Sequence, residues 1–177
     1  MVTTQYLDKE INFEHSNKKL LEDVIHYGMS LGADFIEIFL ESTDNISVLV
    51  EEDSITSVSP SFGKGAGIRI FKDKRDGFVS TNDLSRDGLI NSISQAVQML
   101  DIKEPNNYEK FQGLEDLRNY SKRKHDWLRN VPSVDEISEK LLLSTTSLKK
   151  DPKVNIRKSS YARNWQQVLI ASSDGTF

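Results

Sequence analysis

The chain has 177 residues, of which 37% are apolar and 28% charged, which fits one folded domain with a small addition. Its formal net charge is −4 with acids and bases interspersed, so it presents no broad basic field and no nucleic-acid partner is expected. It contains no cysteine, which excludes disulfides, thiol nucleophiles and cysteine-based zinc or iron–sulfur sites.

Hydropathy along the chain predicts no membrane association. No stretch approaches the roughly 18 consecutive apolar residues that a spanning helix requires. Residues 1–10 also do not show the charged-then-apolar pattern of a signal peptide. We therefore expect a cytoplasmic protein.

The amino-terminal half predicts a helix followed by a hairpin. Apolar residues recur at helical spacing from Leu20 to Met29, and Gly32 follows as a stop. The apolar run Phe35–Glu41 is typical of a strand covered on both faces. Residues Thr43–Asn45 are predicted to turn the chain into a second strand, Ile46–Val50.

Further strands and a second helix are expected next. A third strand, Ser54–Ser59, should end at Pro60. Ile68–Phe71 and Gly77–Ser80 are predicted to form a second antiparallel pair. Asp83–Ser85 should cap a helix with a buried stripe, which consists of Leu89, Ile93, Ala96, Val97 and Leu100.

The carboxy-terminal part begins with an irregular excursion, residues 101–131, with a short helix expected around residues 114–120. A capping box formed by Ser133 and Glu136 predicts the start of a third helix. Residues 154–170 are expected to form a hairpin that turns near Arg163 and Asn164. The final Ser-Asp-Gly is a turn signal that normally introduces another strand, so we expect an architecture that continues beyond it.

These elements define an α+β fold, a two-layer sandwich in which helices pack on one face of a mainly antiparallel sheet. We divide the chain into a polar lead-in (residues 1–16), an α+β amino-terminal core (17–100), the excursion (101–131), and a helix plus hairpin (132–177) that leads into a missing carboxy-terminal domain.

No complete catalytic or metal site is predicted, and no catalytic, cofactor-binding or metal-ligating residue is assigned. His15, His26 and His125 are scattered, and no two have the spacing of a helical metal site, so packing or surface histidines are favoured. The carboxylates Glu51, Glu52 and Asp53 could form a metal or acid–base cluster, but solvated charges at a hairpin turn are the simpler interpretation.

Two further patterns also favour structural interpretations. The glycines of Gly63–Gly67 precede a strand and not a helix, which indicates a glycine-rich start of a strand with a bulge or a closely packed neighbour, and not a phosphate loop. The basic run Lys122–Lys124 lies near Tyr120 and Trp127, as in some RNA-binding surfaces, but a solvated loop is favoured in an acidic chain.

Several segments resemble one family. They are Gly32–Glu41, Gly65–Ile70, Gly77–Leu84 and Val168–Gly175. In order and spacing they are similar to the amino-terminal domain of the TldD/PmbA family of zinc metallopeptidases. Their residue pattern is more similar to the TldD branch than to the PmbA branch. The last of them resembles the strand and turn that lead into the β-rich carboxy-terminal domain of that family.

This resemblance implies peptide-bond hydrolysis by a dimeric protein, in some members a heterodimer of TldD and PmbA type. It also implies zinc held by a His-Glu-x-x-x-His helix in the carboxy-terminal domain, a motif that this chain does not contain. We therefore expect the non-catalytic amino-terminal part of a metallopeptidase, which helps to shape the dimer contact and the cleft for a peptide or unfolded-protein substrate. We also expect it to offer an edge of its sheet, between residues 35 and 81, to an extended peptide by strand addition.

The alternative is a stand-alone interaction or dimerisation module that has lost the metal domain. A reading frame that continues into the zinc motif would support the first hypothesis, and a stop codon the second. A strand edge left exposed at the last hairpin further predicts that the isolated chain self-associates or is only marginally stable.

Overall fold

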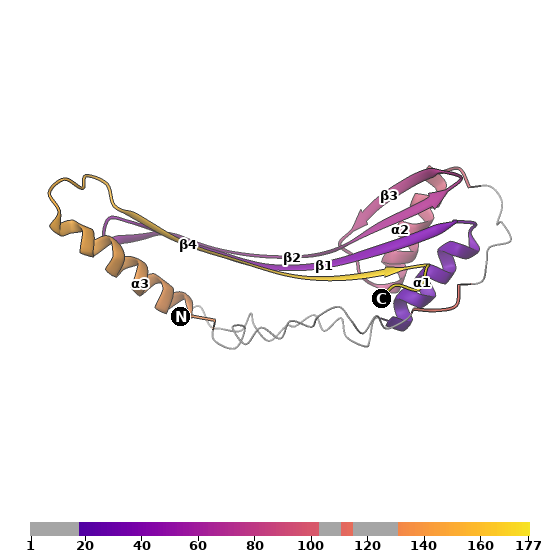
Figure 1. The fold of residues 1–177 in the computed structure, drawn as a ribbon, viewed down its shortest axis with the longest axis horizontal. Coiled ribbons are helices and arrows are strands. Elements are labelled where there is room, and N and C mark those ends of the chain that lie inside the picture. Colours follow the sequence, from indigo (N-terminus) through magenta and orange to yellow (C-terminus); the bar gives the residue numbers. More distant parts are fainter. Residues whose placement is uncertain (1–17, 103–110, 115–130) are drawn as a thin grey trace. The chain divides into compact units, whose positions relative to one another are not determined.

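The computed structural model describes residues 18–102, 111–114 and 131–177. These residues form two compact units, each assembled from separate stretches of the chain. The first unit contains residues 43–62 and 131–166, and the second contains residues 18–42, 63–102, 111–114 and 167–177. Three long strands contribute residues to both units (Figure 1).

The described elements are α1 (Lys18–Ser30), β1 (Phe35–Glu51), β2 (Ser54–Lys72), β3 (Arg75–Thr81), α2 (Arg86–Met99), α3 (Val134–Ser147), the 3-10 turn η2 (Leu148–Lys150) and β4 (Lys158–Ser172). The strands form a sheet in the order β3-β2-β1-β4. β2 and β3 are antiparallel, with Ile68 opposite Val79. Backbone bonds from Glu52 to Arg157 and from Ser173 to Ile36 join opposite ends of β1 and β4, so these strands are antiparallel too. The α+β fold with a mainly antiparallel sheet is confirmed.

The hydrophobic core lies in the second unit, where α1 and α2 pack on the strands. Helix α1 buries Leu21, Val24 and Ile25, as its periodicity predicts. Helix α2 begins at the N-cap Ser85, whose side chain accepts a hydrogen bond from the backbone N–H of Gly88, and buries the predicted stripe. The chain leaves α1 through Gly32, whose φ of 99° explains why a glycine follows the helix.

The first unit has a smaller apolar interior. Its buried hydrophobic side chains, within the described residues, are Val48, Val50 and Ile137. The predicted capping box is present at the start of α3, with both hydrogen bonds between Ser133 and Glu136 formed. The third helix is therefore confirmed.

Two predicted turns are wrong, because β1 and β4 run on through them. The expected turn at Thr43–Asn45 lies inside β1, and the expected turn at Arg163 lies inside β4. The two errors share one cause: Asp44 and Arg163 form an ion pair of 3.5 Å between these neighbouring strands, so residues typical of turns face each other across the sheet.

Pro60 does not end the third strand either, since β2 continues through it to Lys72. Pairing of β2 with β3 begins only at Ala66, so Pro60 lies where β2 has no described neighbour on that side. Proline is tolerated at such a sheet edge because an outward-facing N–H is not needed there. The expected strands thus form four strands, of which β1, β2 and β4 are long and β3 is short.

The division of the chain at residues 16, 100 and 131 remains a prediction. Residues 1–16 and most of 101–131, including residues 115–120 of the short helix expected at 114–120, lie outside the described residues.

Candidate functional site

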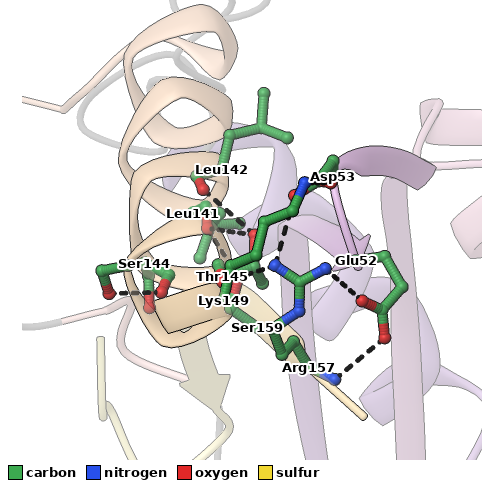
Figure 2. Close-up of polar contacts among 10 residues, drawn as sticks. Glu52, Asp53, Leu141, Leu142, Ser144, Thr145, Lys149, Arg157 and Ser159 are labelled. Atoms are coloured by element: carbon green, nitrogen blue, oxygen red, sulfur yellow. Dashed lines mark hydrogen bonds and ion pairs between the residues drawn. The ribbon is translucent and has the colours of Figure 1, made fainter. Parts of the chain in front are cut away.

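The densest group of charges in the first unit surrounds Arg157 (Figure 2). The Arg157 side chain is only 9% exposed, although it carries a full charge. Its Nη1 donates to Oδ1 of Asp53 at 3.3 Å and to the carbonyl oxygen of Thr145 at 3.2 Å, and its Nη2 donates to Glu52. The backbone N–H of Arg157 donates to the other carboxylate oxygen of Glu52 at 3.1 Å. Arg157 therefore joins the β1–β2 turn to the last turn of α3.

Neighbouring groups complete this cluster. Lys149 Nζ, in η2, donates to the second oxygen of Asp53 at 2.9 Å. Lys158 Nζ, at the start of β4, is 2.5 Å from Oε1 of Glu51. The hydroxyl of Ser159 donates to the carbonyl of Leu141 in α3 at 3.0 Å. We call Glu51, Glu52, Asp53, Lys149, Arg157 and Lys158 the Arg157 cluster.

Two carboxylates of the cluster, Glu52 and Asp53, have lowered pKa values and are held in their charged form. The backbone N–H of Arg157, followed by its guanidinium, lowers the pKa of Glu52. Hydrogen bonding from Lys149 lowers the pKa of Asp53, and hydrogen bonding to Glu52 raises the pKa of Arg157. A carboxylate with a lowered pKa is a poor proton donor near neutral pH, so the cluster suits a structural role better than acid–base chemistry.

The sequence interpretation of these carboxylates was half right. Glu52 and Asp53 do form the turn between β1 and β2, with Glu52 at a φ of 54°. They are not merely solvated charges, however, because they neutralise an arginine that is 105 and 104 residues away along the chain. Nothing in the local sequence around residue 52 points to a partner at that separation.

Zinc, which the resemblance implies for the longer family proteins, finds no fitting site among the residues that the structure describes. In the described part of the chain, no three histidine, cysteine, aspartate or glutamate side chains come together in a group that could hold a metal ion. His26 is exposed on α1, and the carboxylates of the Arg157 cluster are already bound by cations. His15, His125 and the run Lys122–Lys124 lie outside the described residues.

The second unit contains a smaller polar group at the start of β1. Lys72, whose side chain is 6% exposed, donates to Asp34 at 2.9 Å. Asp34 also accepts the backbone N–H of Asp73, and this bond, followed by the one from Lys72, lowers its pKa. The pair fixes the β2–β3 turn, where Asp73 and Lys74 have positive φ.

The glycine run Gly63–Gly67 lies inside β2 and not at the start of a strand, which corrects its predicted position. The predicted close approach of a neighbour is confirmed. A Cβ on Gly67 would lie 3.0 Å from the ring of Phe78, and one on Gly65 would lie 3.1 Å from Oδ1 of Asn82. Glycine therefore makes room for β3 and the residue that follows it.

The part of β2 that precedes its pairing with β3 is longer than the strand that the sequence predicts. Residues Ser54–Phe62 are all exposed, and we call this stretch the open edge. Ile55, Val58 and Phe62 are 45%, 40% and 57% exposed. The strand was expected to end at Pro60, whereas β2 continues through it to Lys72.

None of the helices in the described part of the chain has the length and apolarity needed to cross a bilayer.

The described residues therefore form an α+β domain that contains structural ion pairs and an exposed strand edge. Residues 36–100 match the family model of the PmbA/TldA metallopeptidase domain 1. This match confirms the resemblance of the chain to the amino-terminal domain of the TldD/PmbA family. No curated protein matches the sequence significantly.

Solved structures share the fold at low sequence identity. TldE from Thermococcus kodakarensis has a TM-score of 0.69 and 23% identity, over 88% of this chain and 35% of that one. A proposed modulator of DNA gyrase from Bacteroides thetaiotaomicron has a TM-score of 0.67 and 21% identity, over 92% of this chain and 38% of that one. A second such modulator, from Thermotoga maritima, has a TM-score of 0.61 and 15% identity, over 87% and 34%. The chain thus spans about a third of the length of these proteins.

Proposed function

We propose that this chain is the non-catalytic amino-terminal part of a TldD-like zinc metallopeptidase. The observation that carries the proposal is the match of residues 36–100 to the first domain of that metallopeptidase family. The residues that could bind zinc also support the proposal. The chain has three histidines at scattered positions and no cysteine, which do not supply a zinc site of the family type. Peptide-bond hydrolysis would then be a property of a longer protein, with the metal held outside this chain.

Within such a protein, this domain helps to form the substrate cleft and the contact between subunits. Its partners are a peptide or unfolded protein and a second subunit, either identical or of the TldD/PmbA pair, in the cytoplasm. An antiparallel sheet with an exposed strand edge supports the peptide role, since extended peptides bind by adding a strand to such an edge.

A protease assay on the purified chain tests the non-catalytic role. The chain should not cleave unstructured casein, with or without added zinc, and a chelator should change nothing. Cleavage that co-purifies with the chain and is abolished by the chelator would show that it carries a complete metal site. Sedimentation equilibrium tests the subunit contact: a concentration-dependent dimer is expected, and a monomer at all concentrations would contradict this part of the proposal.

A further inference from the structure

Helix α3 buries much less apolar surface than the helices of the second unit. The buried residues of α3 are Ile137, Ser138 and Thr145, of which only Ile137 is apolar. Helix α2, in contrast, buries the apolar side chains of Leu89, Ile93, Ala96 and Val97. Leu143 of α3 is 63% exposed. Burial of apolar surface therefore stabilises the docked position of α3 less than that of α2.

Polar contacts attach α3 to the strands of the first unit (Figure 2). The carbonyl oxygen of Thr145 accepts a hydrogen bond from Arg157 Nη1 at 3.2 Å. The carbonyl oxygen of Leu141 accepts one from the hydroxyl of Ser159 at 3.0 Å. In η2, which directly follows α3, Lys149 donates to the β1–β2 turn at 2.9 Å. Its side chain is 62% exposed and that of Arg157 only 9%, and exposed ion pairs contribute little, so Arg157 provides the stronger attachment.

We propose that α3 and η2, residues 134–150, form an arm that opens away from the strands of the first unit, and that Arg157 is the latch that holds this arm closed. An element that buries little apolar surface opens at a lower free-energy cost than the core of the protein. β1 and β4 are neighbours in the sheet and are joined by a backbone hydrogen bond from Glu52 to Arg157, to which α3 does not contribute. The strands therefore stay paired when the arm opens.

The latch can release without leaving an unpaired charge. When the arm opens, Arg157 loses the carbonyl oxygen of Thr145 but keeps Glu52 and Asp53, which lie on the β1–β2 turn. A charged side chain that retains its partners does not add the large cost of an uncompensated charge to the opening step. The arm thus has a closed and an open position that share the same ion pairs at Arg157. This inference does not depend on the proposed function.

The test uses single thiols in the whole chain, which contains no cysteine of its own. Thr145→Cys reports on α3 and Ser92→Cys reports on α2. The two positions are matched, because both side chains are buried helical hydroxyls that donate to a carbonyl of the preceding turn. The rate of reaction with an aromatic disulfide reagent, at a pH of about 8, measures how often each thiol is exposed. Each rate is divided by that of the same variant unfolded in urea.

The thiol at position 145 should react at least about a hundredfold faster than the thiol at position 92. The reason is that α2 buries two more large apolar side chains than α3, and each of them makes opening about tenfold rarer or more. Hydrogen exchange distinguishes the arm from the whole unit. The backbone amides of α3 should exchange at least about tenfold faster than those of residues 46–50 in β1.

Arg157→Met removes the latch and should raise the rate at position 145 at least about tenfold, without changing the rate at position 92. Ser159→Ala removes a weaker bond to α3, guards against misfolding of the first variant, and should raise the rate at position 145 roughly twofold to tenfold. The matched control is Arg163→Met, which removes an arginine whose ion pair is with Asp44 of β1 and should leave the rate at position 145 unchanged.

Three results would overturn the inference. Equal rates at positions 145 and 92 would show that α3 is docked as firmly as α2. An unchanged rate at position 145 in both Arg157→Met and Ser159→Ala, or an equal rise at both positions, would show that Arg157 is not a latch for α3. Exchange of α3 together with residues 46–50 would show that the first unit opens as a whole.

Discussion

Gly28 lies in α1 where the helix meets the sheet and α2, and Gly28→Ala tests how closely these elements pack. A Cβ at this position would lie 2.9 Å from Cγ2 of Ile93 and closer still to Cδ1 of Ile36, whereas carbon atoms in contact are normally about 3.5–4.0 Å apart. Ile36 and Ile93 are both fully buried, so neither can move into solvent. Alanine is better than glycine in a helix by about 1 kcal/mol, and overpacking a core costs about 1–3 kcal/mol.

Two contacts this short place the overpacking cost in the upper part of that range, so Gly28→Ala should lower the free energy of unfolding by about 1–2 kcal/mol. Ile36→Val removes the nearest methyl group and alone should cost about 0.5–1.5 kcal/mol. In the double variant the new methyl fills the space left by the old one, so its cost should be less than the sum of the two. Urea unfolding, with hydrogen exchange in α1 and α2 as the readout, measures these differences in unfolding free energy. A stabilising Gly28→Ala, or strict additivity, would refute the close approach of α1 to Ile36 and Ile93.

Three further predictions concern the Arg157 cluster and the α2 cap. Arg157→Met should accelerate hydrogen exchange at the Glu52–Asp53 turn, and Arg157→Lys should restore protection only in part, because one ammonium cannot replace the several donors of a guanidinium; equal protection in all three proteins would contradict this. The lowered pKa values of Glu52 and Asp53 give stability that is present above their ordinary values of about 4 and lost as the pH falls through the lowered values. On acidification the native chain should therefore lose more unfolding free energy than Arg157→Met does. Identical profiles of unfolding free energy against pH for the two proteins would contradict this expectation. Ser85→Ala removes the acceptor for the Gly88 N–H and should cost about 1 kcal/mol in urea unfolding, whereas Ser85→Asp should retain most of the stability.

Local signals in the sequence predicted the helices well. The start of α3 at Ser133 and the start of α2 at Ser85 each depend on a side chain that binds the backbone N–H three residues later. Such bonds are fully determined by neighbours in the chain, so the residue types alone identify them. The same holds for Gly32, which follows α1 in the conformation that favours glycine.

Strand length could not be predicted in the same way, because it depends on partners far along the chain. Asp44 and Asn164 favour turns when considered locally, yet Asp44 forms an ion pair within the sheet with Arg163, the residue before Asn164. Turn propensity is a local preference, and a cross-strand partner more than a hundred positions away overrides it. The Arg157 cluster was missed for the same reason, since the sequence shows its carboxylates and its arginine only as separate charges.

The two units are stabilised by different interactions. The second unit has a contiguous hydrophobic core formed by α1, α2 and the strands. In the first unit the described buried apolar side chains are few, and its buried side chains include an arginine that is paired with two carboxylates. A buried ion pair adds little net stability, but removing one partner leaves an uncompensated charge. The Arg157 cluster is therefore better understood as a constraint on the arrangement of α3, the β1–β2 turn and β4 than as a source of stability. That constraint fixes the start of β2, and hence the strand on which the open edge lies.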